Sequence, residues 1–342
     1  MGALEKEIRL SFAQRIRGTL PDPYKPLITE AKEKDTPDFK YNSDQTPYAP
    51  QTREILRLLR AKAPDSEIGE HMNAIETEAA SLGVEDPSVP STDALVTSIL
   101  FMGSKSLSHV LSHIDRTKSL LLAIGPKSDL ARRQIITSVM EYWVEKPGTG
   151  INIVDKLLNY SILAPRDVIT WALSDKLHKG EGLCFAYTYE MVSVTLHKVS
   201  NRVRQIVRAR NARGLPLDQR KILDETLQRE QSEMRILFGV VEDALVGVAE
   251  GSVDAMAESR DQDGKAETML RAWGGRWLKV YRRKMAVEEA WVMETLEAGP
   301  KAEEMEDVKV EQPSENGVHN GIGVENGLEN GNTNAEALID LA

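Results

Sequence analysis

The stretch "INIVDKLLNYSILAPRDVITWALS", Ile151 to Ser174, decides the fold class. It holds two short apolar runs separated by "LAP". The first run has the three- and four-residue spacing of one helical face, in Ile153, Val154, Leu157 and Leu158. Pro165 suits the first turn of a second helix, where its missing N–H costs nothing. That second helix is lined by Val168, Ile169 and Ala172. The stretch therefore predicts a helical hairpin rather than a pair of strands.

Similar helical patterns continue on both sides of this hairpin. Helical periodicity is found at about 51–64, 65–82, 91–113, 114–124 and 128–146. Ser91 or Thr92 is the expected N-cap of the third segment, and Ser128 that of the last. No strict repeat length links the segments. We therefore expect an all-α fold, an α-solenoid of degenerate helical hairpins of the armadillo or HEAT kind.

Two longer helices follow, at 184–213 and about 217–249, joined by "RGLPLD". The short join predicts antiparallel neighbours. Their inward positions recur mostly at spacings of three and four, in Leu196, Val199, Val203, Ile206 and Val207, and then in Leu223, Leu227, Met234, Leu237 and Val241. A last helix is expected at 265–296, with Trp273, Trp277 and Trp291.

The two ends of the chain have different compositions from the middle. The pattern of residues 3–17 predicts an amphipathic helix with Leu4, Ile8, Phe12 and Ile16 on one face. Residues 21–50 are rich in proline and polar residues, and predict an arm that Phe39, Tyr41 and Tyr48 could pin onto a neighbouring surface. Beyond Gly299 the chain is acidic and glycine-rich, which predicts a disordered tail. The expected domains are 1–49, the end of a preceding helical domain plus a linker; 50–298, an all-helical domain; and 299–342, the tail.

Composition and charge narrow the function classes. Of the net charge of −10, the ten acids and two bases of residues 301–342 supply −8, so the rest of the chain is close to neutral. Acidity therefore does not exclude a nucleic-acid partner for the folded part. One cysteine among 342 residues excludes a disulfide framework and suits a reducing compartment. No apolar run reaches the roughly 18 residues of a membrane span, so no membrane partner is expected.

Catalytic and metal-binding patterns are weak. His109 and His113 share a helix face, but Val110 stands where a zinc protease needs glutamate, and no third ligand is suggested. "GPKS" at 125–128 lacks the glycines of a phosphate-binding loop. Cys184 is expected to pack in the core as a small apolar residue. We therefore expect no catalytic residue, no metal site and no cofactor, and a protein that is not an enzyme.

The informative charge pattern lies on the first long helix. From Met191 to Leu217 there is no acid, and the run contains Lys198, Arg202, Arg204, Arg208, Arg210 and Arg213. These six residues could form a solvated face that pairs with acids of the return helix, namely Asp224, Glu225, Glu230 and Glu233. They could equally form a basic surface for RNA or for an acidic protein partner. Both interpretations stay open at this stage.

Several blocks resemble one known family together, in order and spacing. They are "DFKYNSDQTPY" (38–48), "GSKSLSHVLSHIDRTK" (103–118), "VMEYWVEKPGTGINIVDKLLNYSILAPRDVITWAL" (139–173) and "YEMVSVTLHKVSNRVRQI" (189–206). Over residues 1–298 the chain resembles the C-terminal part of large subunits of the nuclear mRNA cap-binding complex, fungal members above all. The resemblance implies helical domains similar to the middle domain of initiation factor 4G. It also implies that this sequence lacks counterparts of the first domain and of most of the second.

The same resemblance implies a function. Members of this family form a scaffold that holds a small RNA-recognition-motif subunit, and that subunit binds the 7-methylguanosine cap of RNA polymerase II transcripts. The expected roles are mRNA processing, splicing, export and nonsense-mediated decay, in the nucleus with shuttling to the cytoplasm. The expected partners are the small subunit, capped RNA through it, and RNA-processing and export factors. Two alternatives stay open: a helical adaptor that binds only proteins, and a direct RNA binder through helix 198–213.

Overall fold

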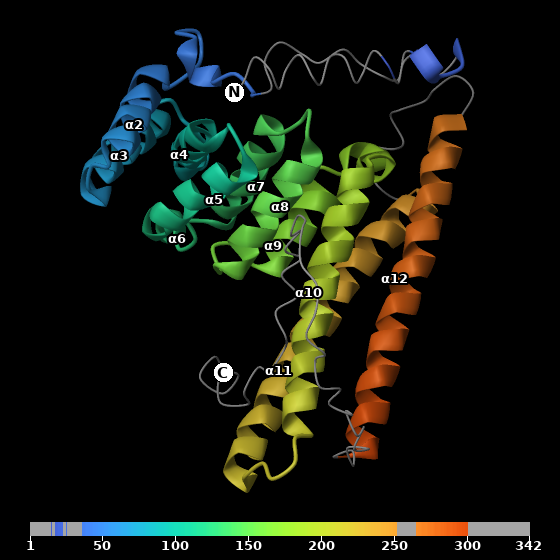
Figure 1. Ribbon diagram of the computed structural model, residues 1–342. Coiled ribbons are helices and arrows are strands. Elements are labelled where there is room, and N and C mark those ends of the chain that lie inside the picture. Colours follow the sequence, from blue (N-terminus) through green and yellow to red (C-terminus); the bar gives the residue numbers. More distant parts are fainter. Residues whose placement is uncertain (1–14, 16–17, 23–24, 26–35, 252–264, 300–342) are drawn as a thin grey trace, which may run out of the picture. The chain divides into compact units, whose positions relative to one another are not determined.

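The computed structural model describes residue 15, residues 18–22, residue 25, and residues 36–251 and 265–299. Every regular element within these residues is a helix (Figure 1). The chain divides into two compact units, residues 1–171 and 172–342. The helix predicted at 3–17 through Leu4, Ile8, Phe12 and Ile16, and the predicted disordered tail, lie outside the described residues.

The first unit is a stack of helices in which chain neighbours pack as pairs. Its helices are α2 (Ala49–Ala61), α3 (Asp65–Ser81), α4 (Ser88–Gly103), α5 (Leu107–Arg116), α6 (Lys118–Ile124), α7 (Asp129–Tyr142), α8 (Pro147–Asn159) and α9 (Pro165–Thr170). Helix α2 packs on α3, α4 on α5, and α7 on α8, while α4 also contacts α2, α3 and α7. The prediction of an all-α solenoid is confirmed.

Helix α4 is the centre of this unit because it is apolar on nearly every side. Leu95 and Ile99 are almost fully buried, and so are the small residues between them. A helix that is hydrophobic all round must be covered on all faces, which explains its three neighbouring helices besides α5. At its end, Gly103 lies so close to the backbone of Val110 that a Cβ atom would overlap it.

The start of α4 differs from the sequence prediction. Ser91 and Thr92, expected as N-cap candidates, are buried inside the helix, which begins at Ser88. An Asp86 carboxylate oxygen accepts hydrogen bonds from the backbone N–H of Ser88, at 3.0 Å, and from its hydroxyl. Asp86, two residues before Ser88, therefore accepts hydrogen bonds at the helix start, a role that was predicted for Ser91 or Thr92. The N-cap predicted at Ser128 is confirmed, since its Oγ accepts from the backbone N–H of Ala131 at 2.9 Å.

The stretch 151–174 forms the two predicted helices, but the two do not pack mainly on each other. Ile153, Val154 and Leu157 of α8 are buried, while Leu158 is half-buried. Pro165 stands in the first turn of α9, as predicted. Helix α8 packs against α5 and α7, and α9 packs against α7. The two helices therefore bury their apolar faces on a common neighbour rather than chiefly on each other. A π-helical turn at Trp171–Asp175 follows α9.

The arm before α2 is pinned as predicted. Phe39 and Tyr41 are 2% and 3% exposed, and Phe39 stacks on Phe101 of α4 with ring centroids 4.8 Å apart. A short 3₁₀ helix, η2 (Lys40–Asn42), brings Tyr41 inward. Tyr48 is only half-buried and precedes α2 in a left-handed conformation.

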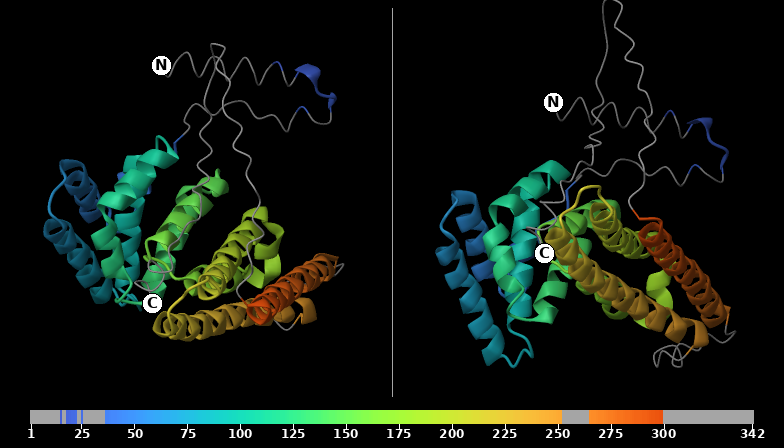
Figure 2. Two further views of the ribbon diagram at one scale, coloured as in Figure 1. Left: turned by 60° about the horizontal axis from the view of Figure 1, so that its bottom comes forward. Right: turned by 90° about the horizontal axis from the view of Figure 1, so that it is seen from below.

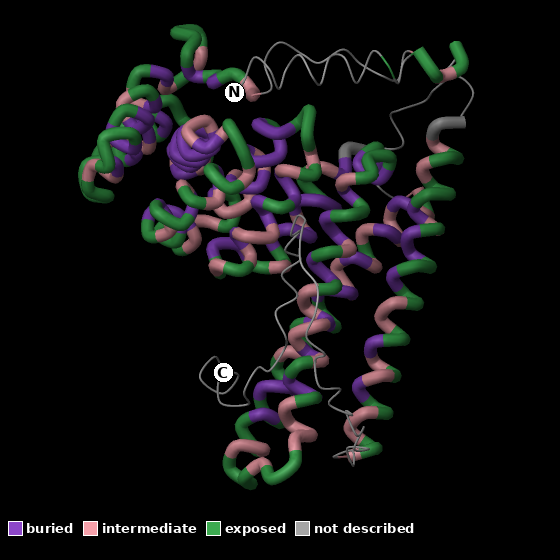
Figure 3. Tube along the Cα trace, in the orientation of Figure 1, coloured by how far each residue is buried: buried purple, intermediate pink, exposed green. Residues whose placement is uncertain are grey.

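The second unit contains three long helices: α10 (Ala186–Arg210), α11 (Leu217–Glu250) and α12 (Lys265–Ala298). They run side by side in alternating directions, with α12 packed on α11 and α10 (Figures 1 and 2). The antiparallel pair is therefore confirmed, and α12 adds a third member. The predicted inward positions of α10 and α11 are buried except Val199, which is half-buried (Figure 3).

The prediction that Cys184 packs in the core is wrong, because this residue is exposed. It ends the 3₁₀ helix η4 (His178–Cys184) and does not belong to α10. Phe185 has an extended backbone with φ −90° and ψ 123°, so the helical register of α10 begins only at Ala186. The apolar pattern that places later residues in the core therefore does not extend to Cys184.

Candidate partner and nucleic-acid interface

The six basic residues, five on α10 and Arg213 just after it, do not form one continuous stripe. At 3.6 residues per turn, Arg204 and Arg208 lie one turn apart on one flank of the helix. That flank faces α12, while Arg202 and Arg210 reach toward α11 on the other. The acid-free run from 191 to 217 is therefore divided between two neighbouring helices.

On the α11 flank the basic residues pair with acids of the return helix. Arg210 Nε donates to Asp224 Oδ1 at 2.8 Å. Arg202 Nε lies 3.9 Å from Glu230 Oε2, a looser ion pair. Two of the four acids expected to pair across the hairpin thus do so, and these contacts hold α10 against α11.

On the α12 flank Arg204 makes a partly buried contact. Its Nε donates to Glu288 Oε2 at 2.6 Å, and its guanidinium lies 4.7 Å from the ring centroid of Trp291. Glu288 is only 7% exposed, and a buried carboxylate left without its partner is strongly destabilising. Arg204 is therefore a packing residue of the α10–α12 contact. Arg208 lies over the same ring at 5.7 Å, but it is exposed.

The solvent-facing basic residues of α10 and its join are Arg208 and Arg213. Lys198 is half-buried and interacts within the chain. A ligand approaching α10 would therefore meet two exposed arginines rather than six free cations. Binding of RNA or a partner by the six residues stays a prediction.

Three exposed basic residues on α12 were missed by the sequence reasoning. Arg276, Lys279 and Arg283 recur at spacings of three and four and are all exposed. The pattern is visible in "GGRWLKVYRR" (274–283), but interspersed acids farther along the helix hid it. Neighbouring Arg282 instead pairs with Glu242 of α11, whose Oε1 lies 2.6 Å from its Nη2. Helix α12 thus presents more unburied positive charge than α10.

The two histidines singled out from the sequence have ordinary local contacts. His109 Nδ1 lies 2.7 Å from the Ser106 hydroxyl that caps α5. Burial lowers the pKa of His113, and the nearby Arg116 and His109 lower it further. Among residues 36–251 and 265–299, no three His, Cys, Asp or Glu side chains gather as metal ligands would. Within the same part of the chain, no helix is long and apolar enough to cross a membrane.

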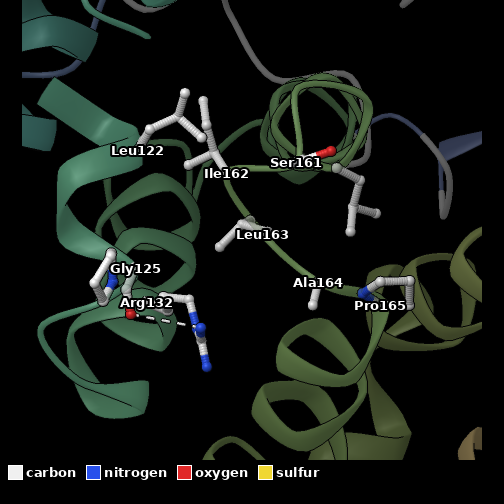
Figure 4. A pocket seen from close by; sticks show the side chains of 10 residues that line it. Leu122, Gly125, Arg132, Ser161, Ile162, Leu163, Ala164 and Pro165 are labelled. Atoms are coloured by element: carbon white, nitrogen blue, oxygen red, sulfur yellow. Dashed lines mark hydrogen bonds between the residues drawn. The ribbon is translucent and has the colours of Figure 1, made fainter. Parts of the chain in front are cut away.

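A cavity of about 510 Å³ lies in the first unit, between α6, α7 and the α8–α9 connection (Figure 4). Most of its lining residues are apolar: Leu122, Gly125, Pro126, Arg132, Leu158, Ser161, Ile162, Leu163, Ala164 and Pro165. Its charged member, Arg132, pairs with Asp129 and lies 3.4 Å from Asp167. Arg132 is the only titratable side chain among these lining residues, so they contain no acid–base pair.

Comparison with known proteins finds one matching family and several similar proteins. Residues 39–290 match the family described as MIF4G like. Nuclear cap-binding protein subunit 1 of Schizosaccharomyces pombe is 24% identical over 320 residues, which cover 92% of this chain and 37% of that protein. Proteins of the same name from Anopheles gambiae and Aedes aegypti are 26% and 25% identical, covering 61% and 67% of this chain. The chain spans between 26% and 37% of the length of these relatives.

Proposed function

The chain belongs to the MIF4G-like family, and on this premise we propose that it is the C-terminal part of the scaffold subunit of a nuclear cap-binding complex. The observation that carries the proposal is the similarity over 92% of the chain to a protein named as subunit 1 of that assembly. The all-helical stack supports it, because such stacks offer extended surfaces to partners.

In this proposal the chain supports a small RNA-recognition-motif subunit, and that subunit holds the 7-methylguanosine cap. Capped RNA reaches the chain through the small subunit, and RNA-processing and export factors bind the assembly. The complex works in the nucleus and shuttles to the cytoplasm, in processing, splicing, export and nonsense-mediated decay. We also propose the domain division 1–49, 50–298 and 299–342, with the middle part as the family's helical domain.

The direct test is co-purification of residues 1–342 with the small subunit, with and without a capped oligonucleotide. We expect a stable complex that retains the capped oligonucleotide and releases an uncapped one of the same sequence. The full-length fission-yeast relative with its own small subunit is the positive control. If that control pair assembles while this chain stays unbound at micromolar concentration, the scaffold role of this part of the protein is wrong.

Two alternatives predict different behaviour. A protein-only adaptor would bind helical or extended peptides and show no preference for a cap. A direct RNA binder would use the exposed arginines of α10, and its affinity would fall steeply with salt because bound phosphates release counterions. The exposure of Arg208 and Arg213 favours the second alternative over the first. Substitution of Arg208 and Arg213 therefore tests direct RNA binding.

A further inference from the structure

Helix α12 carries a second apolar face that the other helices of the second unit leave partly exposed. Met269, Trp273, Val280 and Val287 are 54%, 38%, 45% and 52% exposed. Spacings of four and seven residues place them along one side of the helix. Figure 3 shows exposed residues along the length of α12. Together with the exposed basic residues of the same side, they form what we call the α12 stripe: Met269, Trp273, Arg276, Lys279, Val280, Arg283 and Val287.

The stripe is distinct from the face that holds α12 in the second unit. The buried face contains Trp277, Tyr281 and Val292, whose mean direction lies about a third of a turn around the helix from that of the stripe. Single exposed apolar residues are ordinary on protein surfaces. Four on one side of a helix, spread over about 27 Å, form a continuous surface with three cations among them. Such a surface fits a segment that is both apolar and acidic.

The chain itself contains a segment of that composition. Residues 335–342, "AEALIDLA", combine Leu338, Ile339 and Leu341 with two acids, Glu336 and Asp340. The preceding part, from 312 to 334, is dominated by glycine, asparagine and glutamate and includes the three "ENG" triplets. We propose that residues 335–342 dock on the α12 stripe of the same molecule, with the leucines and isoleucine against the apolar residues and the acids against the cations.

The connecting chain has the right length for this contact. About 36 residues separate Gly299 from Ala335, and a flexible chain of that length has a root-mean-square reach of about 30–36 Å. Val280, in the stripe, lies about 28 Å along the helix from Gly299 at 1.5 Å per residue. A linker whose reach matches the span maximises the effective concentration of the tethered segment. Two modest surfaces can therefore bind within one molecule although they would bind weakly as separate pieces.

Docking would give the acidic tail a role in the second unit. Glu336 and Asp340 would offset two of the three positive charges of Arg276, Lys279 and Arg283, the largest group of exposed cations on α12. An external acidic ligand, whether RNA or protein, would then have to displace the segment. This inference does not rest on the proposed function, because it concerns one chain alone.

The test is carbodiimide cross-linking of the full chain, which joins a lysine amine to a nearby carboxylate, followed by mass spectrometry of the monomeric fraction. We expect links from Lys279 to Glu336 or Asp340. The Leu338→Ser, Ile339→Ser double variant should lower their yield about fivefold or more, because it removes most of the apolar contact. The matched control is Ile322→Ser with Val324→Ser, which removes two apolar residues from the same tail and should leave the yield unchanged.

The helix side is tested in the same way. Val280→Ser with Val287→Ser should reduce the links, while Ile236→Ser on α11, at a residue 49% exposed, should not. Mixing isotope-labelled and unlabelled chains separates the sources of each link. Links mainly between different copies would overturn the proposal in favour of self-association. Absence of the links, or links that both double variants leave intact, would overturn it as well, and ultraviolet cross-linking of single-stranded RNA to Trp273 would then identify the stripe as a nucleic-acid surface.

Discussion

At the scale of the residue, the most informative side chain is Asp93 of α4. It is buried, and it accepts hydrogen bonds from the Tyr41 hydroxyl and, at 2.7 Å, from the Ser138 hydroxyl of α7. Lys40 Nζ lies 2.6 Å from the same carboxylate. Burial alone would raise the pKa of Asp93, but Lys40 and the hydrogen bonds from Tyr41 and Ser138 outweigh it and hold the pKa below its usual range. One carboxylate thus ties the arm to the helical stack.

The substitution Asp93→Asn should lower the free energy of unfolding by about 2 kcal/mol at pH 7, since hydrogen bonds to a charged group are lost while the shape is kept. A depressed folded-state pKa stabilises the fold above the unfolded value of about 3.9, and this stabilisation is lost as the pH falls through the folded-state pKa. The difference between variant and parent should therefore shrink in acid. Urea unfolding at neutral and acidic pH measures it.

The control for this prediction is Asp44→Asn. Asp44 is 82% exposed and pairs with the exposed Arg53, so its loss should change stability by less than about 0.5 kcal/mol. If the Asp93 and Asp44 variants behave alike at neutral pH, the buried network does not anchor the arm.

At the scale of the element, close helix packing depends on glycines such as Gly103 and Gly274. Gly103 allows the end of α4 to approach the backbone of Val110. Gly274 does the same for α12, because a Cβ atom there would lie 2.9 Å from Val248 Cγ1 and 3.0 Å from the Ala249 nitrogen. The adjacent Gly275 has no such neighbour within 4 Å. A side chain at Gly274 would therefore clash with α11, whereas one at Gly275 would meet open space.

We expect Gly274→Ala to destabilise the second unit by about 1–3 kcal/mol, because the added methyl group forces α11 and α12 apart. The matched variant Gly275→Ala should instead stabilise it by about 0.5–1 kcal/mol, since alanine is the better helix former. Urea unfolding followed by far-UV circular dichroism measures both. A shift of both variants in the same direction would show that α12 does not pack on α11 at this point.

At the scale of the whole molecule, the distribution of charge separates the candidate functions. The tail holds most of the net negative charge, and several cations of the second unit are committed to internal ion pairs. Arg204 is unsuitable for testing RNA binding, because replacing it would leave Glu288 buried and unpaired. The exposed pair Arg208 and Arg213 can be changed without this cost.

If the chain is a scaffold, Arg208→Glu with Arg213→Glu should change the capped-RNA affinity of the assembled complex by no more than about twofold. The control, Lys62→Glu with Lys105→Glu, makes the same change in charge on exposed residues of the first unit. Filter binding over a range of salt concentrations measures both variants. A loss of affinity of about tenfold or more would establish direct RNA contact by these arginines instead. The slope of log affinity against log salt concentration should then also fall in magnitude by about two.

The helices and their inward faces could be predicted from the sequence, because periodicity is a property of neighbouring residues. The faces of α8, α10 and α11 follow from spacings of three and four, and Pro165 and Ser128 mark helix starts through local chemistry. The same local patterns gave wrong predictions at Ser91 and Cys184. The hydrogen bonds of Asp86 and the extended backbone of Phe185 shift the starts of α4 and α10 by a few residues.

Which charges remain available to a partner depends on the packing of the helices and could not be predicted from local patterns. Arg204 meets Glu288, a residue 84 positions away, and Arg202 and Arg210 meet acids of the next helix. Such contacts depend on how helices pack, and local spacing carries no information about that. For the same reason the exposed cations of α12, and the apolar residues beside them, form a recognisable surface only in the folded chain, where another face of that helix is buried.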